Sequence, residues 1–110
     1  MLIVAVVFDF VPGGFGRIKG EILDAIENSR KEEGAQIYDW ALDVTAPDRA
    51  IIFEVWDDQT ALDAHFTHPY MDTLVAALSA ANIRGDIKNY SAEIYEISGK
   101  RDMGFVLPTE

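Results

Sequence analysis

The sequence contains no cysteine, which excludes disulfides, thiolate catalysis and thiolate metal sites. It also lacks an apolar run of the roughly 18 residues that a membrane span needs, and residues 1–4 lack the basic start of a signal peptide. Basic residues are scarce: nine Lys and Arg face nineteen Asp and Glu, for a formal net charge of -10. We therefore expect a cytoplasmic protein that binds neither membranes nor nucleic acids, because this charge repels phosphate groups.

Several familiar site signatures are absent as well. The glycine-rich segment 12–16 follows an apolar run but lacks the Gly-x-Gly-x-x-Gly spacing of a dinucleotide site, so nucleotide and flavin cofactors are not expected. No serine has the surrounding elbow of a hydrolase nucleophile. His65, His68 and Asp72 have helical spacing and could together hold a metal. Pro69 interrupts that helix, however, which favours a helix cap or an exposed residue for His68, and we expect no metal.

The hydrophobic pattern predicts one α+β domain. The chain has 110 residues, of which 49% are apolar, and this is enough for a single modest core. Periodicity predicts strands over residues 2–11, 36–44, 49–56 and 87–98, and helices over residues 15–33, 57–66 and 69–81. The order β-α-β-β-α-β predicts the split β-α-β antiparallel sheet of the ferredoxin-like fold over residues 1–98.

Such a fold covers one face of the sheet with helices and leaves the other face bare. The first strand is apolar on both sides, and alternate positions of the next two strands offer large aromatic side chains to the face that points away from the helices. We therefore expect a homodimer in which two sheets pack face to face. The tail, residues 99–110, is predicted to dock on the partner subunit through apolar side chains worth about 1.5 to 3 kcal/mol each. The alternative is a disordered tail. The apolar side chains of the tail are Met103, Phe105, Val106 and Leu107.

The strongest candidate site combines Glu54, Trp56 and His65. Side chains alternate along a strand, so Glu54 and Trp56 share one face with Ile52, and the following helix can bring His65 over that face. A carboxylate bonded to one imidazole nitrogen would fix the tautomer of a base suited to a phenol-like hydroxyl. Trp56 would supply an apolar wall for a flat ring. In the structural alternative, Trp56 is core, Glu54 pairs with an arginine and His65 is a satisfied half-buried histidine.

Three segments of the sequence resemble the antibiotic biosynthesis monooxygenase family, and the similarity is closest to its quinol-monooxygenase-like branch. These segments are Ser29–Gly34 leading to Tyr38, Phe53–Asp58 and Ala61–Tyr70. The resemblance covers residues 2 to about 98. It implies a dimeric α/β barrel with a pocket between the sheet and the helices of each subunit. Some members oxygenate quinols or polycyclic phenols with O2 and use neither metal nor flavin.

The sequence departs from two branches of this family. Relatives that oxygenate anthrones pair the strand-end Trp with an Asn four residues earlier and an Arg on the second helix, where this chain has Ile52 and, near the second position, Ala76. Relatives that degrade haem need an Asn on the first strand and a later haem-ligating His, where this chain has Val6 and Val75. We therefore do not expect haem degradation.

The resemblance implies an oxidoreductase: a cofactor-free monooxygenase that oxidises a small aromatic quinol or polycyclic phenol with O2. We predict His65 as the base and Glu54 as its orienting carboxylate. The predicted substrate-binding residues are Trp56 as the ring wall, Tyr70 as a donor to a developing oxyanion, and Phe8, Trp40 and Phe66. One alternative is a non-oxygenating binder or isomerase of the same dimeric fold. Another is a structural dimer whose pocket is filled by its own aromatic side chains.

Overall fold

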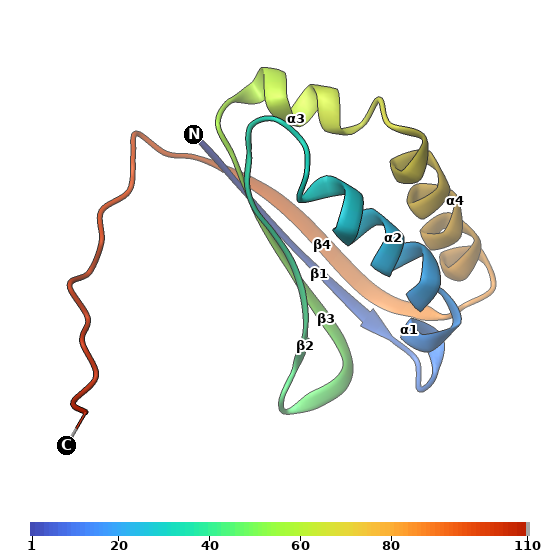
Figure 1. Cartoon of the computed structure of the whole chain (residues 1–110). Helices are drawn as coiled ribbons and strands as arrows, with labels where there is room; N and C mark the ends of the chain where they lie inside the picture. The colour runs from blue at the N-terminus through green and yellow to red at the C-terminus, as the bar shows by residue number, and fades with distance from the viewer. Residues whose placement is uncertain (110) are drawn as a thin grey trace.

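The computed structural model describes residues 1–109 and consists of a four-stranded antiparallel sheet with helices on one face (Figure 1). The strands are β1 (Leu2–Phe10), β2 (Ala35–Asp43), β3 (Ala46–Trp56) and β4 (Ile87–Glu96), in the spatial order β2-β3-β1-β4. The helices are α1 (Gly14–Arg17), α2 (Lys19–Ser29), α3 (Gln59–His65) and α4 (Pro69–Ile83). The predicted ferredoxin-like α+β fold is confirmed.

Two predicted elements have the wrong boundaries. The helix predicted over 15–33 is divided at Ile18, which leaves the helical region with φ −119° and ψ 14°, and α2 already ends at Ser29. The division follows a glycine-rich first turn, where helix propensity is poor. The third strand begins at Ala46 rather than at residue 49. Pro47 is accommodated there because the register of β2 and β3 shifts at this end, and such irregularities tolerate proline.

The helix-facing side of the sheet holds the core. Tyr38, Ile52 and Trp56 are buried on this side, and the predicted alternation of β3 is therefore confirmed. One cluster joins the sheet to α2 and α4 around Phe10, and a second joins it to α3 around Trp56. Burial of such large side chains is worth about 1.5 to 3 kcal/mol each and fixes which way the sheet faces.

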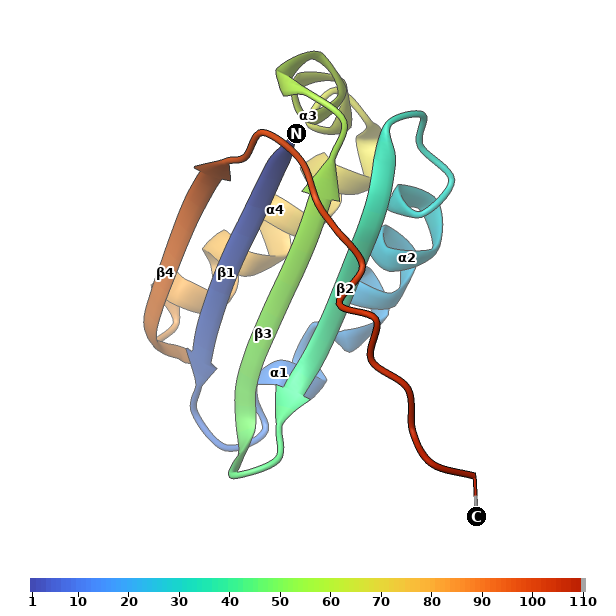
Figure 2. The same ribbon diagram turned by 90° about the vertical axis from the view of Figure 1, so that its left-hand side faces the viewer.

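The opposite side of the sheet faces away from the helices (Figure 2). Ile37, Ile51 and Phe53 are 37%, 37% and 41% exposed there. The predicted run of aromatics on this face is wrong, because Phe53 is the one aromatic residue of β2 and β3 that points this way; the others face the helices. The tail leaves β4 on the bare side and extends away from the body, with residues 99–109 exposed. The predicted docking of the tail stays a prediction, and part of it falls on Glu110, outside the described residues. The predicted homodimer also stays a prediction, which a measurement of the molecular mass in solution would test.

The end of β3 passes directly into α3, and this connection sets up the site. Asp58 caps α3, because its Oδ1 accepts a hydrogen bond from the backbone N–H of Ala61 at 2.9 Å. His68 then takes the cap position of α4 ahead of Pro69, as the sequence predicted. Of the helices in residues 1–109, none has both the length and the apolarity to cross a membrane.

Candidate functional site

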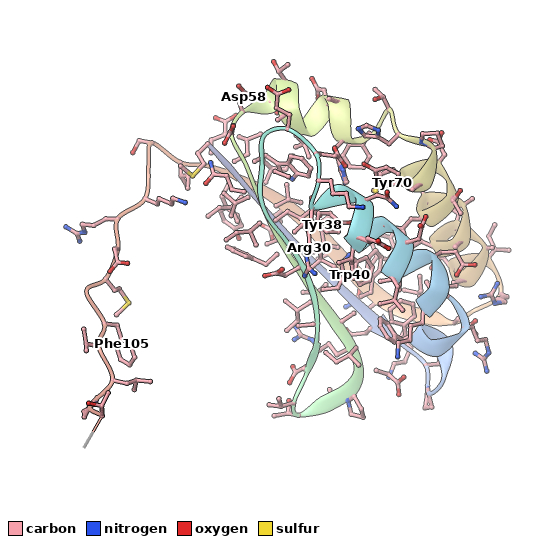
Figure 3. The ribbon with its side chains drawn as sticks, viewed as in Figure 1. Arg30, Tyr38, Trp40, Asp58, Tyr70 and Phe105 are labelled. Carbon is pink, nitrogen blue, oxygen red and sulfur yellow. The ribbon has the colours of Figure 1, made fainter. Side chains whose placement is uncertain are left out.

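A cavity of about 330 Å³ lies between the helix-facing side of the sheet and the helices α3 and α4. All four strands contribute to its wall, which is largely apolar. Phe8, Trp40 and Phe66 line this cavity, and Figure 3 shows Trp40 between the sheet and the helices. They leave open space between them, which contradicts the alternative of a pocket filled by its own aromatic side chains.

His65 occupies the last position of α3 and lines the cavity. Its side chain is fully buried, with ring centroids 4.6 Å from Trp56, 5.4 Å from Tyr38 and 5.0 Å from Phe66. Nδ1 lies 2.7 Å from a carboxylate oxygen of Glu32. Within residues 1–109, the buried Nε2 has no hydrogen-bond partner.

The carboxylate that contacts His65 is therefore Glu32, and the predicted pairing with Glu54 is wrong. Glu32 follows α2 in the turn to β2, and its side chain is 6% exposed. The Tyr70 hydroxyl donates to the same oxygen at 2.5 Å, and His68 Nε2 lies 3.4 Å from the other oxygen. The sequence did not predict these contacts of Glu32, because a run of charged residues is typical of a solvated surface. The single available signal was that Glu32 falls in a segment of the family resemblance.

Glu54 lies in the cavity wall but makes a different contact. Its side chain accepts a hydrogen bond from Trp56 Nε1 at 2.9 Å, and the residue is 7% exposed. The structural alternative in which Glu54 pairs with an arginine is wrong for the described chain, since none of its ion pairs involves Glu54. Burial raises the pKa of Glu54 from 4.5 to about 7, although the bond from Trp56 lowers it, and the nearby charge of Glu32 adds to the rise.

The protonation state of His65 follows from its surroundings. Burial lowers the pKa of His65 below 6.5, and the bond and charge of Glu32 act in the opposite direction. The imidazole is therefore neutral at neutral pH. Because a carboxylate only accepts hydrogen bonds, the hydrogen of this neutral ring is assigned to Nδ1, and the lone pair lies on Nε2. A neutral imidazole with a free Nε2 can accept a proton, although burial makes it a weaker base than a solvated imidazole.

Two predicted substrate-binding residues do not line the cavity. Trp56 is fully buried behind Glu54 and His65, where it supports their side chains rather than forming a ring wall. The Tyr70 hydroxyl is committed to Glu32, so its predicted role as a donor to an oxyanion in the cavity is wrong; burial and this contact raise the pKa of Tyr70. Figure 3 shows Tyr70 beside α4.

Comparison with known proteins decides the family. The sequence model of antibiotic biosynthesis monooxygenases matches residues 1–77, more than half of the chain. The chain belongs to this family. Solved structures of antibiotic biosynthesis monooxygenases share the fold: a Deinococcus radiodurans protein assigned to the family superposes with a TM-score of 0.79 over 94% of this chain and 98% of its own. A second such structure has a TM-score of 0.76 over 90% of this chain and 100% of its own.

These antibiotic biosynthesis monooxygenases are distant in sequence, at 19% and 21% identity, so they establish the fold alone. A Nitrosomonas europaea protein assigned to the family gives a TM-score of 0.78 at 16% identity, over 90% of this chain and 100% of its own. An uncharacterised Synechocystis protein is 42% identical over 50 residues, which is 46% of this chain. The chain spans about a third of the length of that curated relative, since the match covers 34% of it.

Replacing Glu54 with Gln is expected to change how the stability of this monooxygenase family member depends on pH. The raised pKa means that the folded protein keeps a proton between pH 4.5 and about 7 where the unfolded chain loses it. Wild-type stability therefore falls as pH rises through this window, by about 2 to 3 kcal/mol in total. The amide of the E54Q variant does not titrate, so this variant would carry no such loss. Urea unfolding at about pH 5 and about pH 8 measures the difference.

The free energy of unfolding of E54Q, relative to wild type, is expected to be higher at the upper pH than at the lower one. The titration of His65 is common to both proteins and cancels in this difference. Glu93 offers a matched control, because it is an exposed carboxylate that also borders the cavity. E93Q shows what removing an exposed carboxylate from the same cavity does to the free energy of unfolding. A constant difference between E54Q and wild type would contradict the raised pKa of Glu54.

Proposed function

We propose that this protein oxidises a quinol or a polycyclic phenol with O2 and without a bound cofactor. The observation that carries the proposal is that His65, whose buried Nε2 has no hydrogen-bond partner among the described residues, lines an apolar cavity of about 330 Å³, a size suited to an aromatic ligand. A buried, neutral imidazole nitrogen of this kind is suited to accept a proton from a bound hydroxyl. Membership of the monooxygenase family supports an oxygenation as the reaction.

The base is needed because O2 reacts slowly with closed-shell molecules. His65 Nε2 takes the proton of the substrate hydroxyl, and the resulting anion passes one electron to O2. The two radicals combine through a C–O bond, and His65 returns its proton to the peroxide. The hydroperoxide then loses water and leaves a carbonyl, so that one oxygen atom enters the product and the other leaves in water with two substrate hydrogens.

The remaining side chains of the cavity fit this sequence of steps. In its protonated form, Glu54 can donate a hydrogen bond to the oxygen that carries developing negative charge, and a pKa of about 7 keeps this form populated at neutral pH. Phe8, Trp40 and Phe66 supply flat walls for an aromatic ring. The largely apolar wall of the pocket also disfavours water beside the radical pair.

We expect oxygen uptake above the rate of autoxidation with an uncharged quinol or anthrone, and a KM at least about tenfold higher for a matched sulfonated analogue. The reason is that the cavity wall contains Glu54 and Glu93 but no Lys or Arg among the described residues, so an anionic substituent would be buried without a partner. An oxygen electrode measures the uptake, with heat-denatured protein as the control for autoxidation.

The same panel separates the competing functions. A quinol that raises the melting temperature of the protein but causes no oxygen uptake would replace the proposal with a non-oxygenating binder or isomerase. Equal KM values for the neutral and sulfonated members of a pair would contradict the charge argument, even where oxygenation is observed.

A further inference from the structure

We propose that Glu32 is a positioning residue for His65. In this role it holds the imidazole in the tautomer that presents a free Nε2 to the cavity, and it pairs with the ring after a proton has been taken. The kinetic part of this inference rests on the proposed function, whereas the tautomer and the pairing do not.

The contacts of Glu32 connect four segments of the chain. Its carboxylate, in the turn between α2 and β2, meets His65 Nδ1 from α3 at 2.7 Å and the Tyr70 hydroxyl from α4 at 2.5 Å. His68, from the link between these helices, approaches the second oxygen at 3.4 Å. A buried carboxylate is costly unless donors surround it, and here His65 and Tyr70 contact one oxygen by hydrogen bonds while His68 lies near the other. The carboxylate is therefore held in one orientation toward His65.

Glu32 acts on His65 without touching the cavity. It borders a separate surface hollow together with Lys31, Glu33, Ala64 and His68, and this hollow shares no lining residue with the cavity beside His65. A substrate in the cavity therefore meets His65 and Glu54 but not Glu32. This separation distinguishes a positioning residue from one that contacts the reacting atoms.

The backbone brings Glu32 close to α3 by means of a glycine. Gly34 has a φ of +85°, and a Cβ at this position would lie only 2.5 Å from the Cβ of Ala61 in α3. Its carbonyl also accepts a hydrogen bond from the backbone N–H of Asp57 at 2.9 Å. The turn that carries Glu32 is therefore fixed against the start of α3, and a residue with a side chain would strain the backbone and collide with the helix.

Glu32 affects both the neutral and the protonated form of the His65 imidazole. In the neutral form, the carboxylate accepts the hydrogen of Nδ1 and leaves Nε2 as the acceptor. In the protonated form, its charge offsets the burial that lowers the pKa of His65. The other titratable groups that surround the ring are Tyr38, with a pKa raised to about 12, and Glu54 in the cavity wall; His68, when charged, lowers the pKa of His65. Glu32 is therefore the group that strengthens this base.

Replacing Glu32 with Gln tests the inference, and E33Q is the matched control. Glu33 is the neighbouring carboxylate, is exposed and borders the same hollow, so both variants remove one negative charge from the same turn. Nitrogen NMR of the imidazole reads out the tautomer and the pKa of His65 without any substrate. We expect wild type and E33Q to show the Nδ1–H tautomer, and E32Q to show a mixed tautomer and a lower pKa for His65.

With an accepted quinol, E32Q should lose kcat by about 10- to 100-fold, with KM changed by less than about threefold. The acidic limb of its pH–rate profile should move to lower pH. An Nε2–H tautomer in wild type would overturn the inference even if E32Q failed to fold, and so would an unchanged His65 pKa in folded E32Q. A wild-type protein that takes up no oxygen with any quinol would overturn the proposed function, while the NMR result would still decide the role of Glu32.

Discussion

Oxygen uptake with an accepted quinol is expected to fall by about 100- to 10,000-fold when His65 is replaced with Asn, which is the effect of removing a general base. His65 lines the cavity, and its unpartnered Nε2 is the nitrogen that can take the proton, whereas an amide nitrogen has no comparable basicity. Asn can still present an N–H group near the position of Nδ1, so Glu32 keeps a donor and the fold is disturbed little. An oxygen electrode measures the loss.

Two controls show whether the loss of oxygen uptake comes from the missing base or from a disturbed fold. Added imidazole should restore part of the uptake in H65A, where the missing ring leaves space beside the cavity. Quinol binding, measured by the rise in melting temperature, should persist in H65N. Uptake by H65N at the wild-type rate would sink the assignment of His65 as the base and leave Glu54 as the remaining candidate in the cavity wall.

Replacing Trp56 with Ala is expected to reduce the free energy of unfolding by about 3 to 5 kcal/mol. The indole is fully buried, packs against the ring of His65 and donates its N–H to Glu54, so the variant loses packing and a buried hydrogen bond together. Urea unfolding measures the loss, which is a large part of the stability of a domain of this size.

Trp56→Phe separates the two contributions. Phe keeps an aromatic ring in the core but removes the donor, and this should cost about 1 to 3 kcal/mol at a pH where Glu54 is ionised. The bond from Trp56 lowers the pKa of Glu54, so W56F should raise that pKa further. Equal losses in W56A and W56F would mean that the hydrogen bond, not packing, dominates. A loss below about 1 kcal/mol in W56A would contradict the core position of Trp56.

Local patterns were enough to predict the fold and half of the candidate site. Alternation along β3 correctly placed Ile52, Glu54 and Trp56 on the buried face, since neighbours on a strand follow a fixed period. Pro69 correctly marked the start of α4. Each of these features depends on residues within a few positions of one another.

The partner of His65 could not be predicted in the same way. Glu32 lies 33 residues before His65 in the sequence, and their contact exists only because α2, α3 and α4 meet above one end of the sheet. Glu54 was closer in sequence and lay on the correct face, but it accepts its hydrogen bond from Trp56 Nε1 and not from His65. Sequence spacing thus identified the residues near the cavity, and tertiary packing decided which of them form pairs.

Because of the close approach at Gly34, the strength of the base and the shape of the cavity depend on different parts of the chain. The strength of the base depends on the spacing between a turn and α3, which is set by a residue without a side chain. The shape of the cavity depends on other segments, chiefly side chains of β1, β4 and α4. Substitutions in those segments can therefore alter which ring is accommodated and leave the proton chemistry intact. In this architecture, the contact between Glu32 and His65 depends on the backbone at Gly34, whereas the shape of the cavity depends on side chains of other segments.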